Sequence, residues 1–318
     1  MVAAIGIALG LGGCGGSSQA VGPQTSTASP TSTATTTPAD PAKDCIDKVR
    51  GAQVRHGYRG IIFENRYASR LGVAALRGCW QKVQVPRSGG KAQGNRIELV
   101  KAPGSASDPA RPATSVMRVE LRPFDGGGAQ GDVTDTGGYR ANRAEVLARL
   151  GDYGTPASEW PDPVNSTRWY AFSVYMPPGF PESDSGSHWL DFTQWKGMYS
   201  GSPAVALGTK DDEIVVDGKH IDAHLHRIVP GRWLSLRIGI HFSPDPHDGW
   251  MTVAVNGRTV LPVTHGATMN TYWNSNRHHE LVDPSYLKQG IYRSDTWDKT
   301  AVIYFGPVRI GTTASSVS

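Results

Sequence analysis

Three short segments of the chain alternate chemically useful side chains with apolar ones. Alternate side chains of an extended strand leave on the same face, so each segment would present its polar groups together. Residues 286–293 would place Tyr286, Lys288, Gly290 and Tyr292 on one face. Glycine in a strand leaves a gap, so a ligand backbone would have room there beside two phenols and an ammonium group. This segment is therefore a candidate binding surface.

The other two segments are less distinctive when each is taken alone. An Arg-x-Glu pattern begins at Arg118 and again at Arg143. Alternating Arg and Glu on a solvated face form ion pairs of little energetic value. Gln194 and Lys196 share a face within an apolar stretch that starts at Trp189, which polar decoration of an edge strand would also explain. These two segments indicate a functional site only in combination with residues 286–293.

Period-two alternation of apolar and polar residues predicts the strands that would position these groups. The Asn256-Gly257 dipeptide between two such runs readily adopts the positive φ angles of a tight hairpin turn. The predicted strands are residues 115–122, 169–176, 233–242, 251–255, 258–263 and 302–305. Only residues 143–150 carry a convincing helical pattern. Many antiparallel strands without intervening helices predict an all-β fold, a β-jelly roll of the concanavalin A-like two-sheet type.

The composition of the 318-residue chain is that of an ordinary globular protein, with 38% hydrophobic and 19% charged residues, 38 Gly and 22 Pro. This balance argues against coiled coils and membrane bundles. A net charge of +4, spread along the chain, permits an acidic partner. The sequence has no nucleic-acid-binding motif, so we expect no nucleic-acid partner. Nine Trp and eleven Tyr against seven Phe provide flat apolar faces with a polar edge, which suit the binding of sugars.

Residues 1–14 are almost wholly apolar or small, and their Leu-Gly-Gly-Cys end at Cys14 resembles the lipobox of bacterial lipoproteins. Such a run is too short to span a bilayer. Residues 15–43 are rich in Ser, Thr, Pro and Gly, which predicts a disordered linker. We therefore expect a lipid anchor to the membrane and an extracytoplasmic protein, a bacterial cell-surface lipoprotein or a secreted one. A monomeric domain would occupy residues 44–314, followed by a short tail at 315–318.

Cysteine usage fits an exported protein. Apart from Cys14, the chain has two cysteines, Cys45 and Cys79. An even pair in an exported chain predicts a disulfide bond between them, with two buried thiols as the alternative. No Cys-x-x-Cys spacing indicates a metal site or a redox dithiol.

Taken in order, the three segments resemble the signatures of the jelly-roll polysaccharide lyases of the alginate lyase, glucuronan lyase and heparin lyase I types. Those signatures are an Arg-x-Glu strand, a Gln-x-His strand and a Tyr-x-Lys-x-Gly-x-Tyr strand. Here they are matched by Arg118 or Arg143 with the glutamate that follows, by Gln194-Trp195-Lys196, and in full by residues 286–292. The Trp-Tyr-x-Phe-Ser-Val-Tyr-x-Pro run at residues 169–177 is similar to the heparin lyase-like subgroup.

This resemblance implies cleavage of a uronic-acid-containing polysaccharide by β-elimination. The C5 proton of a uronide is poorly acidic until the neighbouring carboxylate is neutralised, which hydrogen bonds and positive charge can do. By resemblance Gln194 and an arginine take this role, and the choice between Arg143 and Arg118 stays open. Tyr292 would remove the C5 proton and later protonate the departing O4, with Lys288 as the cation that favours its ionisation.

At one position the chain departs from the family pattern, because Lys196 stands where the Gln-x-His strand has histidine. Two groups are needed where the C5 proton and O4 lie on opposite faces of the sugar. Tyrosine alone suffices where they share a face, as in β-D-glucuronate and β-D-mannuronate. The loss of histidine therefore disfavours guluronate-like and iduronate-like substrates, unless a desolvated Lys196 acts as the base. We expect further substrate contacts from Tyr286, Trp195, Arg122 and Arg293.

The predicted function is a polysaccharide lyase that prefers glucuronan-like or heparin-like chains to alginate. The alternative is a non-catalytic lipoprotein that binds polyuronides on the same scaffold. The resemblance implies no required cofactor and leaves a structural calcium ion open. The His pairs at residues 224–226 and 278–279 lack further ligands at zinc spacing, so we expect no metal site. The paired carboxylates of a glycosidase strand and the Gly-x-Ser-x-Gly elbow are absent, which disfavours a hydrolase.

Overall fold

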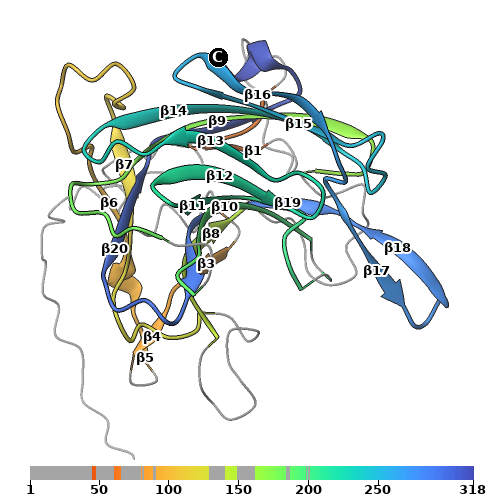
Figure 1. Ribbon diagram of the computed structural model, residues 1–318, viewed down its shortest axis with the longest axis horizontal. Coiled ribbons are helices and arrows are strands. Elements are labelled where there is room, and N and C mark those ends of the chain that lie inside the picture. The colour runs from red at the N-terminus through yellow and green to blue at the C-terminus, as the bar shows by residue number, and fades with distance from the viewer. Residues whose placement is uncertain are drawn as a thin grey trace, which may run out of the picture. The chain divides into compact units, whose positions relative to one another are not determined.

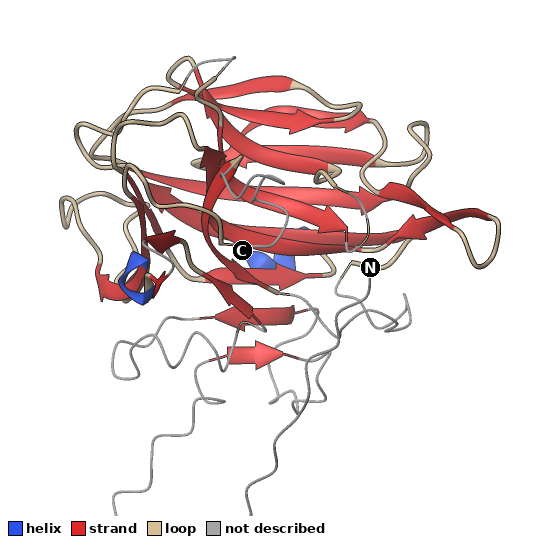
Figure 2. Ribbon diagram, turned by 90° about the horizontal axis from the view of Figure 1, so that it is seen from below, coloured by secondary structure: helices blue, strands red, loops and turns tan. Residues whose placement is uncertain are grey.

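The computed structural model describes residues 45–47, 61–65, 80, 82–88, 91–128, 140–148, 162–183, 187–197, 199 and 201–318 (Figures 1 and 2). The predictions about Cys14, the linker and Cys79 lie outside these residues, and with Cys79 the predicted disulfide bond. Every described element belongs to the unit Ala39–Ser318. No helix in the described part of the chain is long and apolar enough to cross a membrane.

The described elements are almost all strands, and they form two large antiparallel sheets and two small ones (Figure 2). The ten-stranded sheet contains β1 (Cys45–Asp47), β2 (Ile61–Asn65), β6 (Ile97–Lys101), β7 (Ser115–Leu121), β9 (Ser166–Tyr175), β14 (Trp233–Phe242), β15 (Trp250–Val255), β16 (Arg258–His265), β20 (Ala301–Phe305) and β21 (Val308–Gly311). The seven-stranded sheet has the order β13 (Ala223–Arg227), β12 (Glu213–Gly218), β11 (Val205–Lys210), β10 (Leu190–Gly197), β19 (Ser285–Ser294), β8 (Ala141–Leu147) and β3 (Lys82–Gln84). The small sheets are the hairpins β4 (Arg87–Ser88) with β5 (Lys91–Ala92) and β17 (Asn270–Asn274) with β18 (His279–Asp283), and the 3-10 turns are η2 (Gly94–Arg96) and η5 (Ala314–Val317).

The two large sheets enclose one continuous apolar core. Phe172 and Leu236 face each other across β9 and β14 and contribute the side of the ten-stranded sheet. Trp195 and Ile291 contribute the side of the seven-stranded sheet. Because successive side chains of a strand alternate, each buried residue leaves its neighbours on the outer face of the sheet. The all-β jelly-roll prediction is confirmed.

Local predictions of secondary structure were mostly right within the described residues, with one exception. The hairpin turn is present, since Asn256 and Gly257 have φ angles of 50° and 79° between β15 and β16. The helix predicted at residues 143–150 is wrong, because residues up to Leu147 form β8, which is buried along its whole length between β19 and β3. Helix propensity is a weak preference that pairing on both edges and full burial override.

The C-terminal residues are part of the domain rather than a tail. Thr313 caps η5 by accepting a hydrogen bond from the backbone N–H of Ser316, and Val317 is buried. The turn packs against β9, β14 and β21. The predicted boundary at residue 314 is therefore wrong, because a buried apolar side chain lies beyond it.

Candidate active site

The polar residues of the three sequence segments meet on three adjacent strands, β10, β19 and β8. Gln194 of β10 lies opposite Lys288 of β19. Tyr292 of β19 lies opposite Arg143 of β8. Residues directly opposite each other in an antiparallel pair leave on the same face, so the register brings these four side chains to one surface. We call this surface, the outer face of the seven-stranded sheet over β10, β19 and β8, the site face.

Apolar neighbours orient these polar side chains. The alternate residues of the same strands are buried in the core between the sheets: Trp195, Leu287, Ile291, Ala144 and Val146. Burying a large apolar side chain stabilises the fold by about 1.5–3 kcal/mol. A slip of one residue would turn every one of these side chains toward solvent. The core pattern therefore holds the polar set on the site face.

A buried ion network lies at the centre of the site face. The Lys288 Nζ lies 2.5 Å from the Glu145 Oε2, and the Arg143 Nη1 lies 3.2 Å from the same oxygen. The Arg143 Cζ is 4.2 Å from the centroid of the Tyr292 ring, whereas the Lys288 Nζ is 5.9 Å away. Lys288 was expected to be the cation beside Tyr292, but the structure places Arg143 closer. Glu145 holds both cations in position because its carboxylate contacts each of them.

Tyr292 differs from a purely structural tyrosine of the same fold. Its ring is half-buried and packs edge-on against Trp189 at a centroid distance of 4.8 Å. Tyr170, by contrast, is fully buried and donates a hydrogen bond of 2.6 Å to Asp162. Burial raises the pKa of Tyr170 well above its ordinary value, and the Asp162 carboxylate adds to this shift. A partly exposed ring beside a guanidinium is the geometry expected of a phenol that exchanges a proton with a ligand.

Gln194 presents a hydrogen-bond donor with no partner in the described structure. The side chain is only 1% exposed, and its Nε2 makes no hydrogen bond to any described residue. A buried polar group left unpaired costs about 1–3 kcal/mol, so native structures keep few of them. A carboxylate bound on the site face would supply the missing acceptor.

Two lysines of the site face have strongly perturbed pKa values. Burial lowers the pKa of Lys196 to about 8, with nearby Arg143 acting in the same direction and Asp283 opposing it. Burial also lowers the pKa of Lys288 to about 8, although the Glu145 carboxylate favours its charged form. The Lys196 Nζ donates a hydrogen bond of 3.1 Å to the carbonyl oxygen of Gly197. Both lysines therefore change charge near neutral to mildly alkaline pH.

Sequence reasoning missed Asp191, which lies on the site face directly opposite Tyr292. A β-bulge between Asp191 and Thr193 shifts the register, so Asp191 and Gln194 share a face although they are three positions apart. Desolvation raises the pKa of Asp191 well above its ordinary value, and two nearby carboxylates add to the shift. Strict alternation would have placed this residue on the opposite side, so the sequence carries no signal for it.

Gly290 has a different role from the one expected. Its φ angle is +147°, and a Cβ atom there would lie 2.1 Å from the carbonyl oxygen of Ala144. Glycine is needed because this positive φ angle turns the Cβ position toward the backbone of β8. It does not provide the room for a ligand that the sequence pattern suggested.

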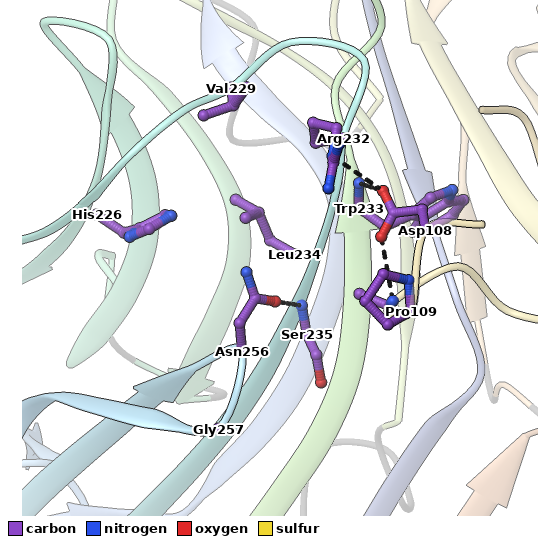
Figure 3. Close-up of a pocket in the computed structure, with 11 residues that line it drawn as sticks. Asp108, Pro109, His226, Val229, Arg232, Trp233, Leu234, Ser235, Asn256 and Gly257 are labelled. Carbon is purple, nitrogen blue, oxygen red and sulfur yellow. Dashed lines mark hydrogen bonds and ion pairs between the residues drawn. The ribbon is translucent and has the colours of Figure 1, made fainter. Parts of the chain in front are cut away.

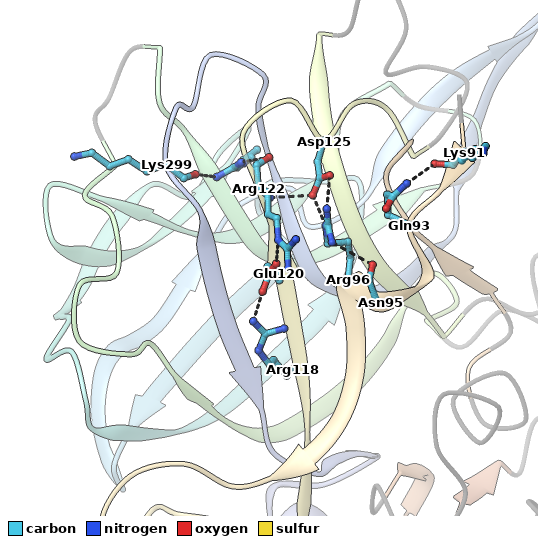
Figure 4. A network of polar contacts seen from close by, with 10 residues as sticks. Lys91, Gln93, Asn95, Arg96, Arg118, Glu120, Arg122, Asp125 and Lys299 are labelled. Carbon is cyan, nitrogen blue, oxygen red and sulfur yellow. Dashed lines mark hydrogen bonds and ion pairs between the residues drawn. The ribbon is translucent and has the colours of Figure 1, made fainter. Parts of the chain in front are cut away.

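Two of the predicted site residues lie away from the site face: Arg118 is on the ten-stranded sheet, and Arg122 directly follows the same strand. Arg118 is on β7 of the ten-stranded sheet, on the face opposite the core residue Val119. Both arginines pair with Glu120 instead of joining the site face (Figure 4). Arg118 as a catalytic residue and Arg122 as a substrate-binding residue are therefore wrong, because the core of the sandwich separates them from Gln194.

The predicted substrate contacts of Trp195 and Arg293 are also wrong, since both side chains point away from the site face. Trp195 is fully buried in the core, where its ring contacts Tyr170 edge-on at 5.2 Å. Arg293 is fully buried and donates hydrogen bonds to the carbonyl oxygens of Lys299 and Arg122. Neither can bind substrate from there. Tyr286 does lie on the site face, opposite Lys196, where it packs against Leu147.

Other features of the described residues do not add to the residues of the candidate active site. No group of three or more His, Cys, Asp or Glu side chains within the described ranges could hold a metal ion. A pocket of about 570 Å³ is bounded by the loops before β7 and β14 and by the β15–β16 turn (Figure 3). Arg232 and Trp233 line it, with Asp108 bound to both. None of the residues of the three motifs lines this pocket.

The fold and the site together define a jelly-roll polysaccharide lyase. The family model described as polysaccharide lyase matches residues 77–309. The chain therefore belongs to the polysaccharide lyase family and is an enzyme of the carbon–oxygen lyase class. No curated protein sequence matches it.

Solved structures with a similar fold include further lyases of this kind. The endo-β-1,4-glucuronan lyase from the fungus Trichoderma reesei is 12% identical, with 75% of this chain and 98% of that chain covered and a TM-score of 0.46. The alginate lyase A1-II′, a member of polysaccharide lyase family 7, is 16% identical, with 73% and 93% covered and a TM-score of 0.42. The family 7 alginate lyase AlyA1 from Zobellia galactanivorans is 11% identical, with 76% and 100% covered and a TM-score of 0.44. The family assignment is based on the family match and not on these similarities.

Proposed function

We propose that the enzyme cleaves a uronic-acid-containing polysaccharide by β-elimination and prefers glucuronan-like or heparin-like chains to alginate. The observation that carries this proposal is the surface shared by Gln194, Arg143 and Tyr292. It combines an unpaired amide donor, a guanidinium and a half-buried phenol. These are the groups that elimination next to a carboxylate requires.

Neutralisation of the substrate carboxylate comes first in this mechanism. The Gln194 Nε2 donates a hydrogen bond to one carboxylate oxygen, and Arg143 adds positive charge. Both interactions grow stronger as negative charge moves onto the carboxylate when the C5 proton leaves, so they stabilise the transition state more than the bound substrate. Glu145 keeps Arg143 in place through its 3.2 Å contact.

Proton transfer is then assigned to Tyr292. As a phenolate it takes the proton from C5, the C4–O4 bond breaks, and a double bond forms between C4 and C5. The same proton goes to O4 of the departing chain, which returns Tyr292 to its starting state. Arg143, 4.2 Å from the ring, supplies the positive charge that favours the phenolate. One residue can serve both steps when the C5 proton and O4 share a face of the sugar, as they do in β-D-glucuronate.

The test is incubation of the protein with glucuronan, hyaluronan, heparin and alginate, followed by ultraviolet absorbance of the new C4–C5 double bond. We expect absorbance to rise fastest with a glucuronate-containing chain. New reducing ends without ultraviolet absorbance would show hydrolysis and contradict the proposed reaction. A faster reaction with guluronate-rich alginate would contradict the substrate preference alone.

Lys196 is expected to act as a cation in this reaction. The charged groups around it are Asp283 at the end of β18, Arg143 and Glu145 on β8, and Lys288 on β19. Below a pH of about 8 Lys196 is protonated and helps to neutralise the substrate carboxylate. As pH rises through this value the charge is lost, so the rate should fall on the alkaline side. Loss of one charged hydrogen bond lowers a rate by about 10- to 100-fold, which is the effect expected for Lys196→Met at neutral pH.

The Lys196→Arg variant distinguishes a role of Lys196 as a cation from a role as the catalytic base. Arginine stays charged, so the variant should keep most of the activity at neutral pH and retain it to higher pH than the wild type. Any alkaline decline left in the variant would come from Lys288, whose pKa is also about 8. If Lys196 were the base, the wild-type rate would instead rise through that pH and Lys196→Arg would be inactive.

A further inference from the structure

An aromatic surface lies beside the site face, on the β17–β18 hairpin and the loop between β10 and β11. The hairpin forms its own two-stranded sheet and projects from the two main sheets (Figure 1). It connects β16 to β19, so its second strand ends at Asp283, two residues before the strand that carries Tyr286. The β10–β11 loop begins directly after Lys196 and Gly197. Both segments therefore extend from the same end of the site face.

Specific contacts hold the hairpin against this loop. The backbone N–H of Tyr199 donates to both carboxylate oxygens of the buried Asp283, at 3.0 and 3.1 Å. Asn270 Nδ2 donates to the carbonyl oxygen of Ser202 at 2.9 Å. The rings of Tyr199 and Tyr272 stack with centroids 4.2 Å apart and planes 23° apart. A lone two-stranded hairpin is only marginally stable, so these contacts fix its position relative to the site face.

The strand register separates the two aromatic residues of β17. Tyr272 lies opposite Leu281, and Trp273 lies opposite Glu280. Neighbouring side chains of a strand leave on opposite faces. Tyr272, stacked on Tyr199, is therefore on the face toward the β10–β11 loop, and Trp273 is on the other face.

The stacked pair is accessible and lies close to Lys196 along the chain. Tyr199 is 41% exposed and Tyr272 is partly exposed. Tyr199 follows Lys196 by three residues, so their Cα atoms are at most about 10 Å apart along an extended chain. A sugar chain that continues past Lys196 at this end would reach the pair after a few residues.

The charge around the pair suits an acidic chain. Lys196 precedes Tyr199 by three residues, and the hairpin tip carries the exposed residues Arg277, His278 and His279. The acidic residues of the same segments are the exposed Glu280 and the buried Asp283. Tyrosine rings offer an apolar face for the C–H groups of a sugar and a hydroxyl for its polar edge. Exposed aromatic rings on segments that also carry Lys196 and Arg277 suit a chain of uronic acids.

We propose that Tyr199 and Tyr272 form a sugar-stacking subsite that binds the acidic polysaccharide several residues away from the cleaved bond. This inference rests on the proposed function, because it takes the same polysaccharide as its ligand. The subsite gives the enzyme a preference for long chains, since short oligosaccharides cannot fill it and the reacting centre together. Its contribution appears in binding and KM rather than in kcat.

The experiment measures the affinity of glucuronate oligosaccharides of increasing length by calorimetry, in the Tyr292→Phe background so that no ligand is cleaved. Tyr272→Ala should weaken the binding of long oligosaccharides about tenfold and leave that of the shortest ones unchanged. Tyr199→Ala, which alters the loop and not the hairpin, should have the same effect. Trp273→Ala is the matched control, because it removes an aromatic ring that is 64% exposed on the other face of the same hairpin. It should bind oligosaccharides of all lengths as the parent does.

Each outcome has a separate meaning. Unchanged affinity of long chains in both tyrosine variants overturns the subsite, while the proposed function stands. An equal loss for short and long chains also overturns it, because it indicates damage at the site face. Absence of binding to any glucuronate oligosaccharide in the parent overturns the proposed substrate, and the subsite with it.

Discussion

The Tyr292→Phe variant is expected to lose about 10³- to 10⁴-fold in kcat, because the reaction would have neither its base nor its acid. The hydroxyl is the only group removed, and the ring can keep its packing against Trp189 and its place beside Arg143. Binding of the polysaccharide and the melting temperature should therefore change little. Production of the unsaturated uronide, measured by ultraviolet absorbance under saturating substrate, checks the prediction.

A second tyrosine provides the matched control for this substitution. Tyr304 of β20 is also a half-buried strand residue, but it belongs to the ten-stranded sheet, where it pairs in register with Arg118. Tyr304→Phe should retain wild-type kcat. A Tyr292→Phe enzyme that keeps more than about a tenth of its rate would exclude Tyr292 as the proton-transfer residue. Lys196 or Asp191 would then be the next group to test.

The Arg143→Gln variant should be about 10²- to 10³-fold slower than the wild type, and Arg118→Gln should be as active as the wild type. Among the described residues, Arg143 provides the positive charge nearest the Tyr292 ring, on the face where the Gln194 Nε2 has no described partner. Its removal weakens both neutralisation of the carboxylate and ionisation of the phenol. Arg118 has the same local sequence pattern but lies on the opposite side of the sandwich.

The two substitutions are matched in their structural consequences. Each arginine forms an ion pair with the glutamate two positions later, and each glutamate also pairs with a second cation. After the substitution Glu145 still pairs with Lys288, and Glu120 still pairs with Arg122. Neither variant leaves a buried carboxylate without a partner, so comparable melting temperatures are expected. Comparison of kcat/KM for the two purified variants at one pH is the measurement. Equal losses in both, or a loss in Arg118→Gln alone, would contradict the assignment of Arg143.

Local sequence patterns were sufficient to predict the strands and most of the polar residues of the site face. Period-two alternation predicted strands where β7, β9 and β14 form, because a half-buried strand needs one apolar face whatever its neighbours are. The Asn256-Gly257 turn followed from backbone sterics alone. The shared face of Tyr286, Lys288 and Tyr292 followed from the same alternation.

Strand pairing decided what the local patterns left open. The two Arg-x-Glu patterns look alike in sequence, and only the register of β8 against β19 places Arg143, not Arg118, beside Tyr292. The bulge in β10 brings Asp191 to the site face, and it arises from the pairing with β11 and β19 rather than from any single residue.

Burial was the second property that the sequence could not supply. The segment predicted to be helical became β8 because it is enclosed between two strands, and Trp195 and Arg293 turned into the interior because their neighbours took the outer face. The sequence by itself determined which residues could do the chemistry, since side-chain type and alternation are local properties. Only the tertiary structure decided which of them meet, because sheet order and register depend on contacts between residues far apart in the chain.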